Sequence, residues 1–138
     1  MKKVLTLGIV MLMVCALMIP VYAAENEITP YFNNTIRASA RFNIEDNGEA
    51  VVTLSFTGYS SCATGATFTS KIQKSTSSGW TDVSGASWVD EFDAARGAVE
   101  HIYQLNSTGT YRLVYEIVVR GTCGEPDVIS DTIEDQYV

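Results

Sequence analysis

The feature that most constrains the fold is a 13-residue segment bounded by glycine at both ends, Gly109 to Gly121. In an extended strand, successive side chains point to opposite faces of the sheet. One face of this segment is therefore entirely apolar or aromatic, and it comprises Tyr111, Leu113, Tyr115, Ile117 and Val119. The other face mixes valine with charged residues. Because β-branched and aromatic residues favour strands, the segment predicts a central strand of an antiparallel sheet, buried on one side and half covered on the other.

The same alternation of apolar and polar residues recurs along much of the chain. In the first alternating run, the inward-facing set begins at Ile36. This run is followed by Asn47-Gly48, which indicates a hairpin because both residues tolerate a positive φ. The alternation predicts six further strands, over residues 35–44, 50–57, 67–74, 80–83, 99–105 and 127–134, with residues 85–89 either continuing the fourth strand or forming a separate edge strand.

Turn signals separate these strands at intervals of about eight to twelve residues, and no stretch has helical periodicity. A chain of about seven such strands is typical of an all-β, antiparallel β-sandwich of the immunoglobulin-like or fibronectin-type-III-like kind. The spacing of Leu105, Gly109 and Tyr111 also matches the tyrosine corner of β-sandwich domains. We therefore expect the Tyr111 phenol to bond back to the preceding connection.

The amino terminus has the three parts of a secretory signal peptide. A basic start at Lys2 and Lys3 precedes an apolar run, and small residues follow it before a cleavage site between Ala23 and Ala24. An uncleaved membrane anchor is the alternative, but the run is shorter than the roughly 20 residues that span a bilayer comfortably. We therefore predict a signal peptide over residues 1–23, a flexible leader over 24–33 and one β-sandwich domain over 34–138.

The charge of the mature chain excludes some classes of partner. Removal of residues 1–23 leaves 115 residues with seven basic and 16 acidic side chains, a formal charge of −9. Binding to nucleic acid or to anionic lipid depends on concentrated basic patches, and the basic residues here are scattered along the sequence. We therefore expect a secreted, extracellular monomer that binds neither nucleic acid nor, after signal cleavage, the membrane.

Two cysteines remain after cleavage, Cys62 and Cys123. In an exported protein an even number of cysteines favours a disulfide, which would close a loop of about 60 residues and stabilise the fold by on the order of 4 kcal/mol. Each cysteine lies just beyond the end of a predicted strand. If the second and sixth strands run in the same direction in opposite sheets, both cysteines reach the same end of the sandwich. Two unpaired thiols are the alternative.

The sequence does not indicate catalysis. His101 is the only histidine, and no Gly-x-Ser-x-Gly motif accompanies it. The three carboxylates within residues 90–93 could hold Ca²⁺ through their oxygens, but their spacing matches no known calcium loop, and a solvated acidic loop is the favoured interpretation. We therefore expect a protein that is not an enzyme and has no cofactor, and we leave calcium binding at residues 90–93 open.

Several short motifs in order along the chain resemble a group of small secreted proteins of Gram-positive gut bacteria. These are a Lys-Lys signal peptide ending at Tyr-Ala-Ala-Glu, residues 28–31 (Ile-Thr-Pro-Tyr), 72–74 (Ile-Gln-Lys), 79–83 (Gly-Trp-Thr-Asp-Val), 87–88 (Ser-Trp) and 109–113 (Gly-Thr-Tyr-Arg-Leu). The resemblance implies an exported protein with a single immunoglobulin-like β-sandwich. It supplies no catalytic residues.

The favoured function is a non-catalytic extracellular binding module whose ligand is a protein or a glycan. Loops at one end of a rigid sandwich are suitable binding sites. The predicted disulfide joins two such loops, residues 58–65 and 121–127, which contain the candidate contact residues Tyr59, Ser60, Ser61, Gly124 and Glu125. The alternative is a structural subunit of the cell surface that assembles through its strand edges.

Overall fold

A computed structural model describes residues 31–138, and the seven elements within this range are all β-strands. The predicted signal peptide, the predicted cleavage site between Ala23 and Ala24, and residues 24–30 of the predicted leader lie outside the described residues. No helix within residues 31–138 is long and apolar enough to cross a membrane. The strands are β1 (Thr35–Ile44), β2 (Glu49–Gly58), β3 (Ala63–Thr76), β4 (Gly79–Phe92), β5 (Arg96–Gln104), β6 (Gly109–Gly121) and β7 (Asp127–Tyr137).

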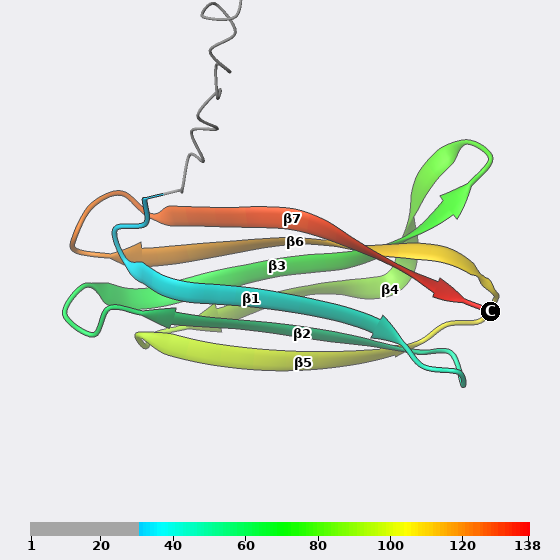
Figure 1. The fold of residues 1–138 in the computed structure, drawn as a ribbon, viewed down its shortest axis with the longest axis horizontal. Coiled ribbons are helices and arrows are strands. Elements are labelled where there is room, and N and C mark those ends of the chain that lie inside the picture. Colours follow the sequence, from blue (N-terminus) through cyan, green and yellow to red (C-terminus); the bar gives the residue numbers. More distant parts are fainter. Residues whose placement is uncertain (1–30) are drawn as a thin grey trace, which may run out of the picture. The chain divides into compact units, whose positions relative to one another are not determined.

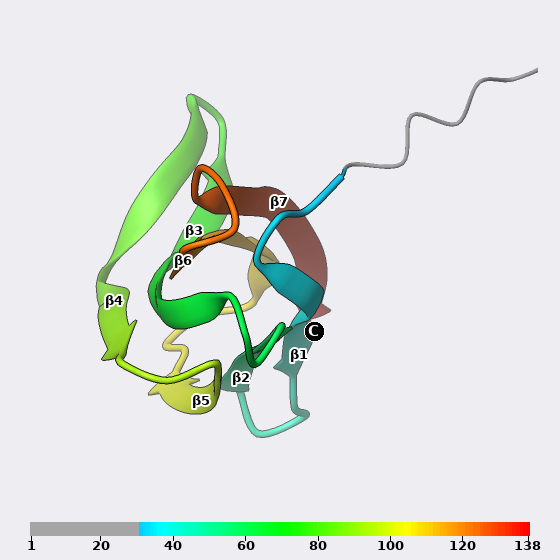
Figure 2. The same ribbon diagram turned by 90° about the vertical axis from the view of Figure 1, so that its left-hand side faces the viewer.

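The strands form two antiparallel sheets that pack face to face (Figures 1 and 2). One sheet has three strands in the order β1-β2-β5, and the other has four in the order β4-β3-β6-β7. All observed pairings are antiparallel. The predicted all-β sandwich of seven strands is therefore confirmed, and the strand order is compatible with an immunoglobulin-like or fibronectin-type-III-like arrangement.

The strand over Gly109–Gly121 lies inside the four-stranded sheet as β6, paired with β3 on one side and β7 on the other. Its predicted inward face is buried, except that Tyr115 is half-buried. The core between the sheets consists of Phe42, Ala50, Val52, Leu54, Phe56, Ala63, Ala66, Phe68, Ile72, Ala86, Leu105, Tyr111, Leu113, Ile117 and Val119. Burial of this alternating set fixes the register of the strands that carry it, because a shift of one residue would turn the apolar side chains to water.

Two predicted local features are confirmed with one change of detail. The chain reverses at Asn47-Gly48, but only Gly48 has a positive φ, of 83°, and the Gly48 N–H donates to the Glu45 carbonyl at 2.9 Å. The Tyr111 hydroxyl donates to the Ser107 carbonyl at 2.6 Å, as a tyrosine corner requires. In each case a few residues close in sequence set the turn.

The segment over residues 90–97 differs from the prediction. Asp90, Glu91 and Phe92 belong to β4, which runs as one edge strand from Gly79 to Phe92, with a positive φ at Gly85 and a register shift opposite Lys71–Gln73. The acidic loop predicted at residues 90–93 is therefore wrong for its first three members. Long-range pairing with β3 overrides the polar local sequence, which taken alone favours a loop.

Two further boundaries move for similar reasons. The predicted loop over residues 58–65 is shorter, because β2 includes Gly58 and β3 begins at Ala63. The prediction that Ile36 faces inward is wrong, since this side chain is 56% exposed. A register irregularity between Thr35 and Arg37 turns Thr35 inward instead, where its hydroxyl donates to the Asp127 carboxylate at 2.8 Å.

Candidate functional site at the disulfide end

The Cys62–Cys123 disulfide joins the β2–β3 and β6–β7 connections, with 5.2 Å between the two Cα atoms. β2 and β6 lie in opposite sheets, so the disulfide links the two layers at one end. Figure 2 faces this end and shows the two connections, green and orange, beside the segment that leads into β1. The predicted pairing of the cysteines is confirmed, and the predicted strand directions explain it.

Asp127, the first residue of β7, ties the start of the described chain to this end. Its carboxylate accepts hydrogen bonds from the backbone N–H groups of Asn33 and Asn34, both at 2.8 Å, and from the Thr35 hydroxyl. The Asn34 amide group donates to the Glu125 carbonyl at 3.1 Å and accepts from the Cys123 N–H at 3.3 Å. Residues 33–35 are therefore fixed against the β6–β7 connection.

The protonation equilibrium of Asp127 reflects these contacts. Burial alone raises the pKa of the carboxyl group, but the hydrogen bonds from Thr35 and from the backbone of residues 33–35 outweigh burial and hold the pKa below its ordinary value of 3.8. The carboxylate is thus ionised at neutral pH although the residue is only 5% exposed. A charged acceptor makes stronger hydrogen bonds than a neutral one, which suits its role as a clamp.

Backbone hydrogen bonds hold the β2–β3 connection equally firmly. The N–H of Tyr59 donates to the Asn34 carbonyl, and the N–H groups of Cys62 and Ala63 donate to the Tyr59 carbonyl, all between 2.8 and 2.9 Å. The Thr122 N–H donates to the Cys62 carbonyl at 2.9 Å. Three segments distant in sequence therefore share one network of hydrogen bonds around the disulfide.

A hollow of about 290 Å³ lies on this network. It is lined by Tyr31, Phe32, Asn33, Tyr59, Ser61, Cys62 and Cys123. Tyr31 is 89% exposed and Tyr59 is 45% exposed. We define the aromatic end of the sandwich as Tyr31, Phe32 and Tyr59 with the disulfide between them. Hydrogen bonds fix the Tyr59 backbone, so its exposed ring can contact a ligand with little further ordering.

The structure brings together only part of the predicted set of contact residues. Tyr59 and Ser61 line the hollow, whereas Ser60, Gly124 and Glu125 do not. Gly124 lies against Asn33, since a Cβ atom placed on it would come within 2.7 Å of the Asn33 side chain. The Glu125 carbonyl accepts the bond from Asn34. These two residues therefore shape the β6–β7 connection rather than the wall of the hollow.

Tyr31 and Phe32 were not predicted from the sequence as contact residues, because they fall in the segment assigned to the leader. Their position depends on the bonds between Asp127 and residues 33–35, which connect positions more than 90 residues apart. Alternation of apolar and polar residues carries no signal of such contacts. The sequence signal that could have identified them is the adjacent aromatic pair Tyr31-Phe32 after Ile28-Thr29-Pro30, because two aromatic residues are unusual in a polar linker.

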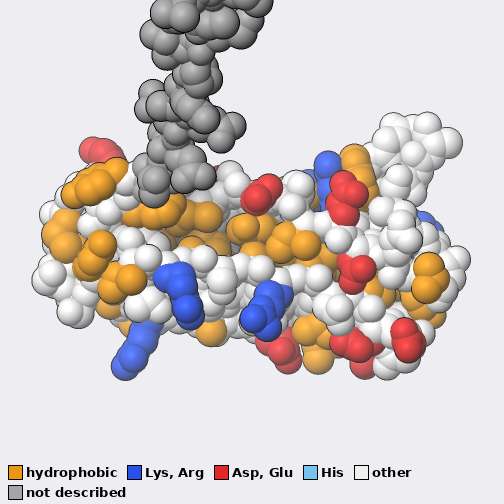
Figure 3. Space-filling view, viewed as in Figure 1, with side chains coloured by type: hydrophobic (Ala, Val, Ile, Leu, Met, Phe, Trp, Pro, Cys, Tyr) orange, Lys and Arg blue, Asp and Glu red, His pale blue; other side chains and the backbone are white. Residues whose placement is uncertain are grey.

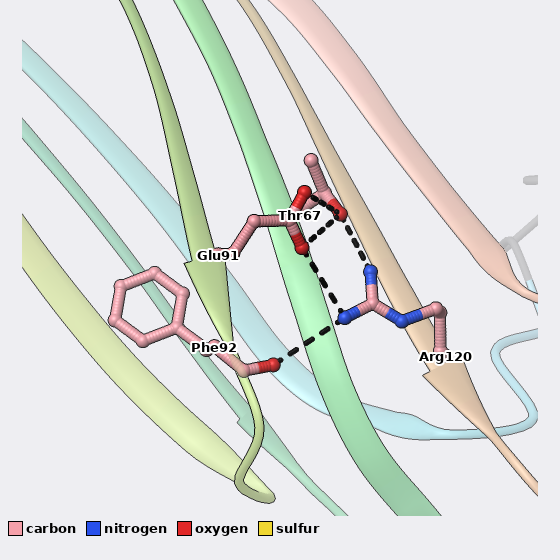
Figure 4. A network of polar contacts seen from close by, with 4 residues as sticks. All are labelled: Thr67, Glu91, Phe92 and Arg120. Carbon is pink, nitrogen blue, oxygen red and sulfur yellow. Dashed lines mark hydrogen bonds and ion pairs between the residues drawn. The ribbon is translucent and has the colours of Figure 1, made fainter.

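The β4–β5 turn is fixed to the same end by an arginine clamp on the outer face of the four-stranded sheet (Figure 4). From β6, the guanidinium of Arg120 donates to the Thr67 hydroxyl at 2.5 Å, and it contacts the Glu91 carboxylate and the Phe92 carbonyl at 3.4 Å each. The arginine crosses β3 at Gly65, where a Cβ atom would lie 2.9 Å from its nitrogen. Glu91 is thereby used in an internal contact.

Asp90, in the same segment, has surroundings separate from those of Glu91. Asp90 faces the opposite side of β4 from Glu91, and its carboxylate lies 2.8 Å from Nε2 of His101. The ring of Trp88 stacks on His101 with 4.6 Å between centroids. No group of three or more His, Cys, Asp or Glu side chains in residues 31–138 is arranged to hold a metal ion.

A second hollow, of about 420 Å³, lies on the outer face of the four-stranded sheet. Its outward-facing side chains are Thr69, Lys71, Ser87, Val89, Val114, Glu116 and Ser130. The sequence signal for this hollow was the valine on the polar face of the segment over Gly109–Gly121. The hollow combines one cation, one anion, hydroxyl groups and valine without a convergent set of polar groups, so we place the candidate site at the aromatic end.

No protein-family model matches the chain, and no curated protein is significantly similar to it in sequence. The resemblance to secreted proteins of Gram-positive gut bacteria therefore stays a prediction.

Proposed function

We propose that the protein is a secreted, non-catalytic binding module that contacts a protein or a glycan outside the cell through its aromatic end. The observation that carries the proposal is the exposure of two tyrosines beside the disulfide. Tyr59 lies on a connection that backbone hydrogen bonds hold in place, and Tyr31 lies two residues before the Asn33 N–H that Asp127 binds. Tyrosine offers a large apolar surface and a polar hydroxyl at a small cost in conformational entropy. Because hydrogen bonds already hold the Tyr59 backbone and residues 33–35, binding would cost little additional ordering there.

The disulfide supports the extracellular part of the proposal. Disulfides persist in oxidising compartments and are rare in the reducing cytosol. The intact mass of the exported protein tests this part directly. We expect a chain that starts at Ala24 and takes up two alkyl groups only after reduction. Retention of residues 1–23, or cysteines that react without reduction, would contradict export with a formed disulfide.

A binding screen with matched variants tests the contact surface. The exported protein is applied to a glycan array, to immobilised mucin and to purified bacterial cell wall, beside the variants Tyr31→Ser/Tyr59→Ser and Val89→Thr. Val89 is 67% exposed and lines the hollow on the four-stranded sheet, so its substitution is the control. We expect binding to fall about tenfold or more in the tyrosine variant, because central aromatic contacts typically supply more than 1 kcal/mol each.

The outcome of the screen discriminates between surfaces. A loss in Val89→Thr with full binding in the tyrosine variant would contradict the proposal and move the site to the four-stranded sheet. Ligand binding that neither variant changes would exclude both surfaces. Molecules that associate with one another as concentration rises, without binding any applied ligand, would instead favour the assembly subunit.

A further inference from the structure

The basic side chains of the described chain divide into two groups according to the sheet that carries them. The four cations of the four-stranded sheet are all engaged within the molecule. Lys71 pairs with Asp82 at 3.0 Å, and Lys74 donates to Ser107 and lies over the Tyr111 ring. Arg112 bonds Gln73 and covers Trp80, and Arg120 forms the clamp described above.

The three cations of the three-stranded sheet are free by comparison. Arg37, Arg41 and Arg96 are exposed, and within the part of the chain that the structure describes no salt bridge or cation–π contact engages them. All three lie on the outer face of the sheet. Figure 3 shows Lys and Arg side chains over β1 and near the start of β5, with an acidic side chain beside one of them and most of the others further toward the opposite end.

Strand register places these arginines in two rows. Arg37 and Arg96 lie in register on either side of Thr57, and Arg41 lies in register with Thr53 and Glu100. Neighbouring strands are about 4.8 Å apart and residues rise about 3.3 Å along a strand, so the Cα atoms of Arg37 and Arg96 are about 10 Å apart and those of Arg37 and Arg41 about 13 Å. We call this surface the arginine face.

The floor between the arginines is open and carries hydroxyl groups. Arg37 and Arg96 border a hollow of about 310 Å³ that also includes Ser55, Thr57 and Ala98. The row between the two arginine rows contains Ser39 and Ser55, whose hydroxyls lie 2.8 Å apart. Small side chains on β5 leave the guanidinium groups accessible from above.

We propose that the arginine face binds a linear polyanionic glycan, a polysaccharide with carboxylate or sulfate groups. Guanidinium binds such groups through paired hydrogen bonds, and the serine and threonine hydroxyls between the arginines can bond sugar hydroxyls. This surface is distinct from the aromatic end, and the proposal does not depend on the function proposed there.

The composition of the face distinguishes a glycan from other polyanions. Stable protein interfaces have an apolar or aromatic centre. Within residues 31–138, no aromatic side chain occurs among the outward-facing residues of β1, β2 and β5, and the apolar Val51 and Ile102 lie in the next row beyond Arg41, outside the two arginine rows. Single-stranded nucleic acid would also need aromatic rings on which bases stack. A ligand that is polar along its whole length fits a face of guanidinium and hydroxyl groups.

The test compares two double variants that change the net charge equally. Arg37→Gln/Arg96→Gln removes two charges from the arginine face, and Lys71→Gln/Lys74→Gln removes two from the opposite sheet. Binding of the exported protein to heparin and to polygalacturonate is measured at low and moderate salt, with neutral dextran as the uncharged control. Polyglutamate and vesicles with phosphatidylserine represent an acidic polypeptide and a lipid surface.

We expect the Arg37→Gln/Arg96→Gln variant to bind at least one of the two glycans about tenfold or more weakly than wild type. The Lys71→Gln/Lys74→Gln variant should bind less than about threefold more weakly, because only the arginine substitutions remove direct charged hydrogen bonds. Affinity should weaken as salt rises. Glu100→Gln, which removes the carboxylate in the Arg41 row, should tighten binding. Tyr31→Ser/Tyr59→Ser should leave glycan polyanion binding unchanged, which separates this proposal from the function proposed above.

Three results would overturn the proposal. One is equal loss of affinity in the two double variants, which would indicate net charge alone. Another is tighter binding to polyglutamate or to the vesicles than to either glycan. The third is no binding to heparin or polygalacturonate at low salt by a protein whose circular dichroism and thermal unfolding match the wild type.

Discussion

The two ends of the sandwich are held together by different kinds of contact. At the disulfide end, residues 33–35, the β2–β3 connection and the β6–β7 connection are joined by Cys62–Cys123, by the Asp127 carboxylate and by Asn34. At the opposite end, turns close on local hydrogen bonds, such as Tyr111 to Ser107 and Gly48 to Glu45, and single long-range hydrogen bonds join them to other segments. These run from the Leu105 N–H to the Gly48 carbonyl, from the Gln104 side chain to the Asn47 carbonyl and from the Ile44 N–H to the Asp135 carboxylate.

This difference suits the opposite end to a role as scaffold and the disulfide end to a role as candidate binding surface. The turns at the opposite end reverse the chain through local geometry and are joined by single long-range hydrogen bonds. The disulfide end brings exposed aromatic side chains from distant parts of the sequence to one place, and it uses a covalent bond and a buried charge to hold them. Long-range cross-links of this kind are what a preformed binding site requires.

The largest expected effect comes from removing the covalent link. Cys62→Ser/Cys123→Ser should lower the free energy of unfolding by about 4 kcal/mol, because the disulfide closes a long loop in the unfolded chain. Denaturant unfolding measures this change. Hydrogen exchange in the variant should increase first in residues 59–62 and 122–126. Equal loosening at both ends would contradict a specific role at the disulfide end.

Asp127→Ala should have the next largest effect, about 2–4 kcal/mol, because it leaves three donors at the disulfide end without their acceptor. Asp135→Ala is the matched control at the opposite end, where the carboxylate accepts one long-range bond, from the Ile44 N–H. We expect it to cost about 1 kcal/mol. If the two substitutions lower the free energy of unfolding equally, the Asp127 carboxylate does not stabilise its end of the sandwich more than Asp135 stabilises the other.

The Asp127 carboxylate also predicts a pH dependence of stability. Because folding lowers the pKa of Asp127, its contribution to stability is fully present above the unfolded pKa of about 3.9 and is lost as pH falls through the lower folded pKa. Denaturant unfolding at several pH values below about 5 measures the slope. The slope should be shallower in Asp127→Ala than in wild type, and an equal slope in the two proteins would contradict this contribution of Asp127.

Tyr111→Phe should lower stability by about 1 kcal/mol, the usual net value of one hydrogen bond, by removing the donor to the Ser107 carbonyl. The loss should appear as faster hydrogen exchange in residues 106–110, with residues 59–62 unaffected. Loosening of the disulfide end in this variant would show that the two ends are coupled.

The smallest expected change in stability is that of Tyr59→Ser, within about 0.5 kcal/mol, because the side chain is largely outside the core and the Tyr59 backbone makes the local hydrogen bonds. Thermal unfolding measures this change. A substantial loss of stability would mean that Tyr59 is a structural residue rather than a contact residue.

The same contrast explains how far the sequence predicts the structure. Alternation along the segment over Gly109–Gly121, the Asn47-Gly48 turn and the Tyr111 corner depend on local chemistry, and each was predictable. The predicted directions of the second and sixth strands also placed both cysteines at one end of the sandwich. The extension of β4 to Phe92 and the clamp at Asp127 depend on partners far away in sequence. From the sequence alone, residues 90–92 were therefore predicted as a polar loop, and Asp127 was predicted only as the first residue of the last strand.

The candidate site was predicted to a smaller extent than the fold. Tyr59 and Ser61 were found from loop position, whereas Tyr31 and Phe32 join them only through the Asp127 bonds. Part of the arginine face could be predicted from the sequence, since Arg37 and Arg41 alternate with apolar residues along one strand. Arg96 came from a segment without regular pattern, and only strand pairing places it beside Arg37.

Hydrogen exchange of the oxidised protein tests most directly whether the disulfide end is a preformed platform. We predict that the amides of Asn34, Tyr59, Cys62 and Thr122 exchange nearly as slowly as those of the central strands, because each donates to a fixed acceptor. The exposed tip at residues 77–78 should exchange fast. Exchange of the disulfide-end amides at the rate of that tip would contradict a preformed platform and, with it, the proposed binding site.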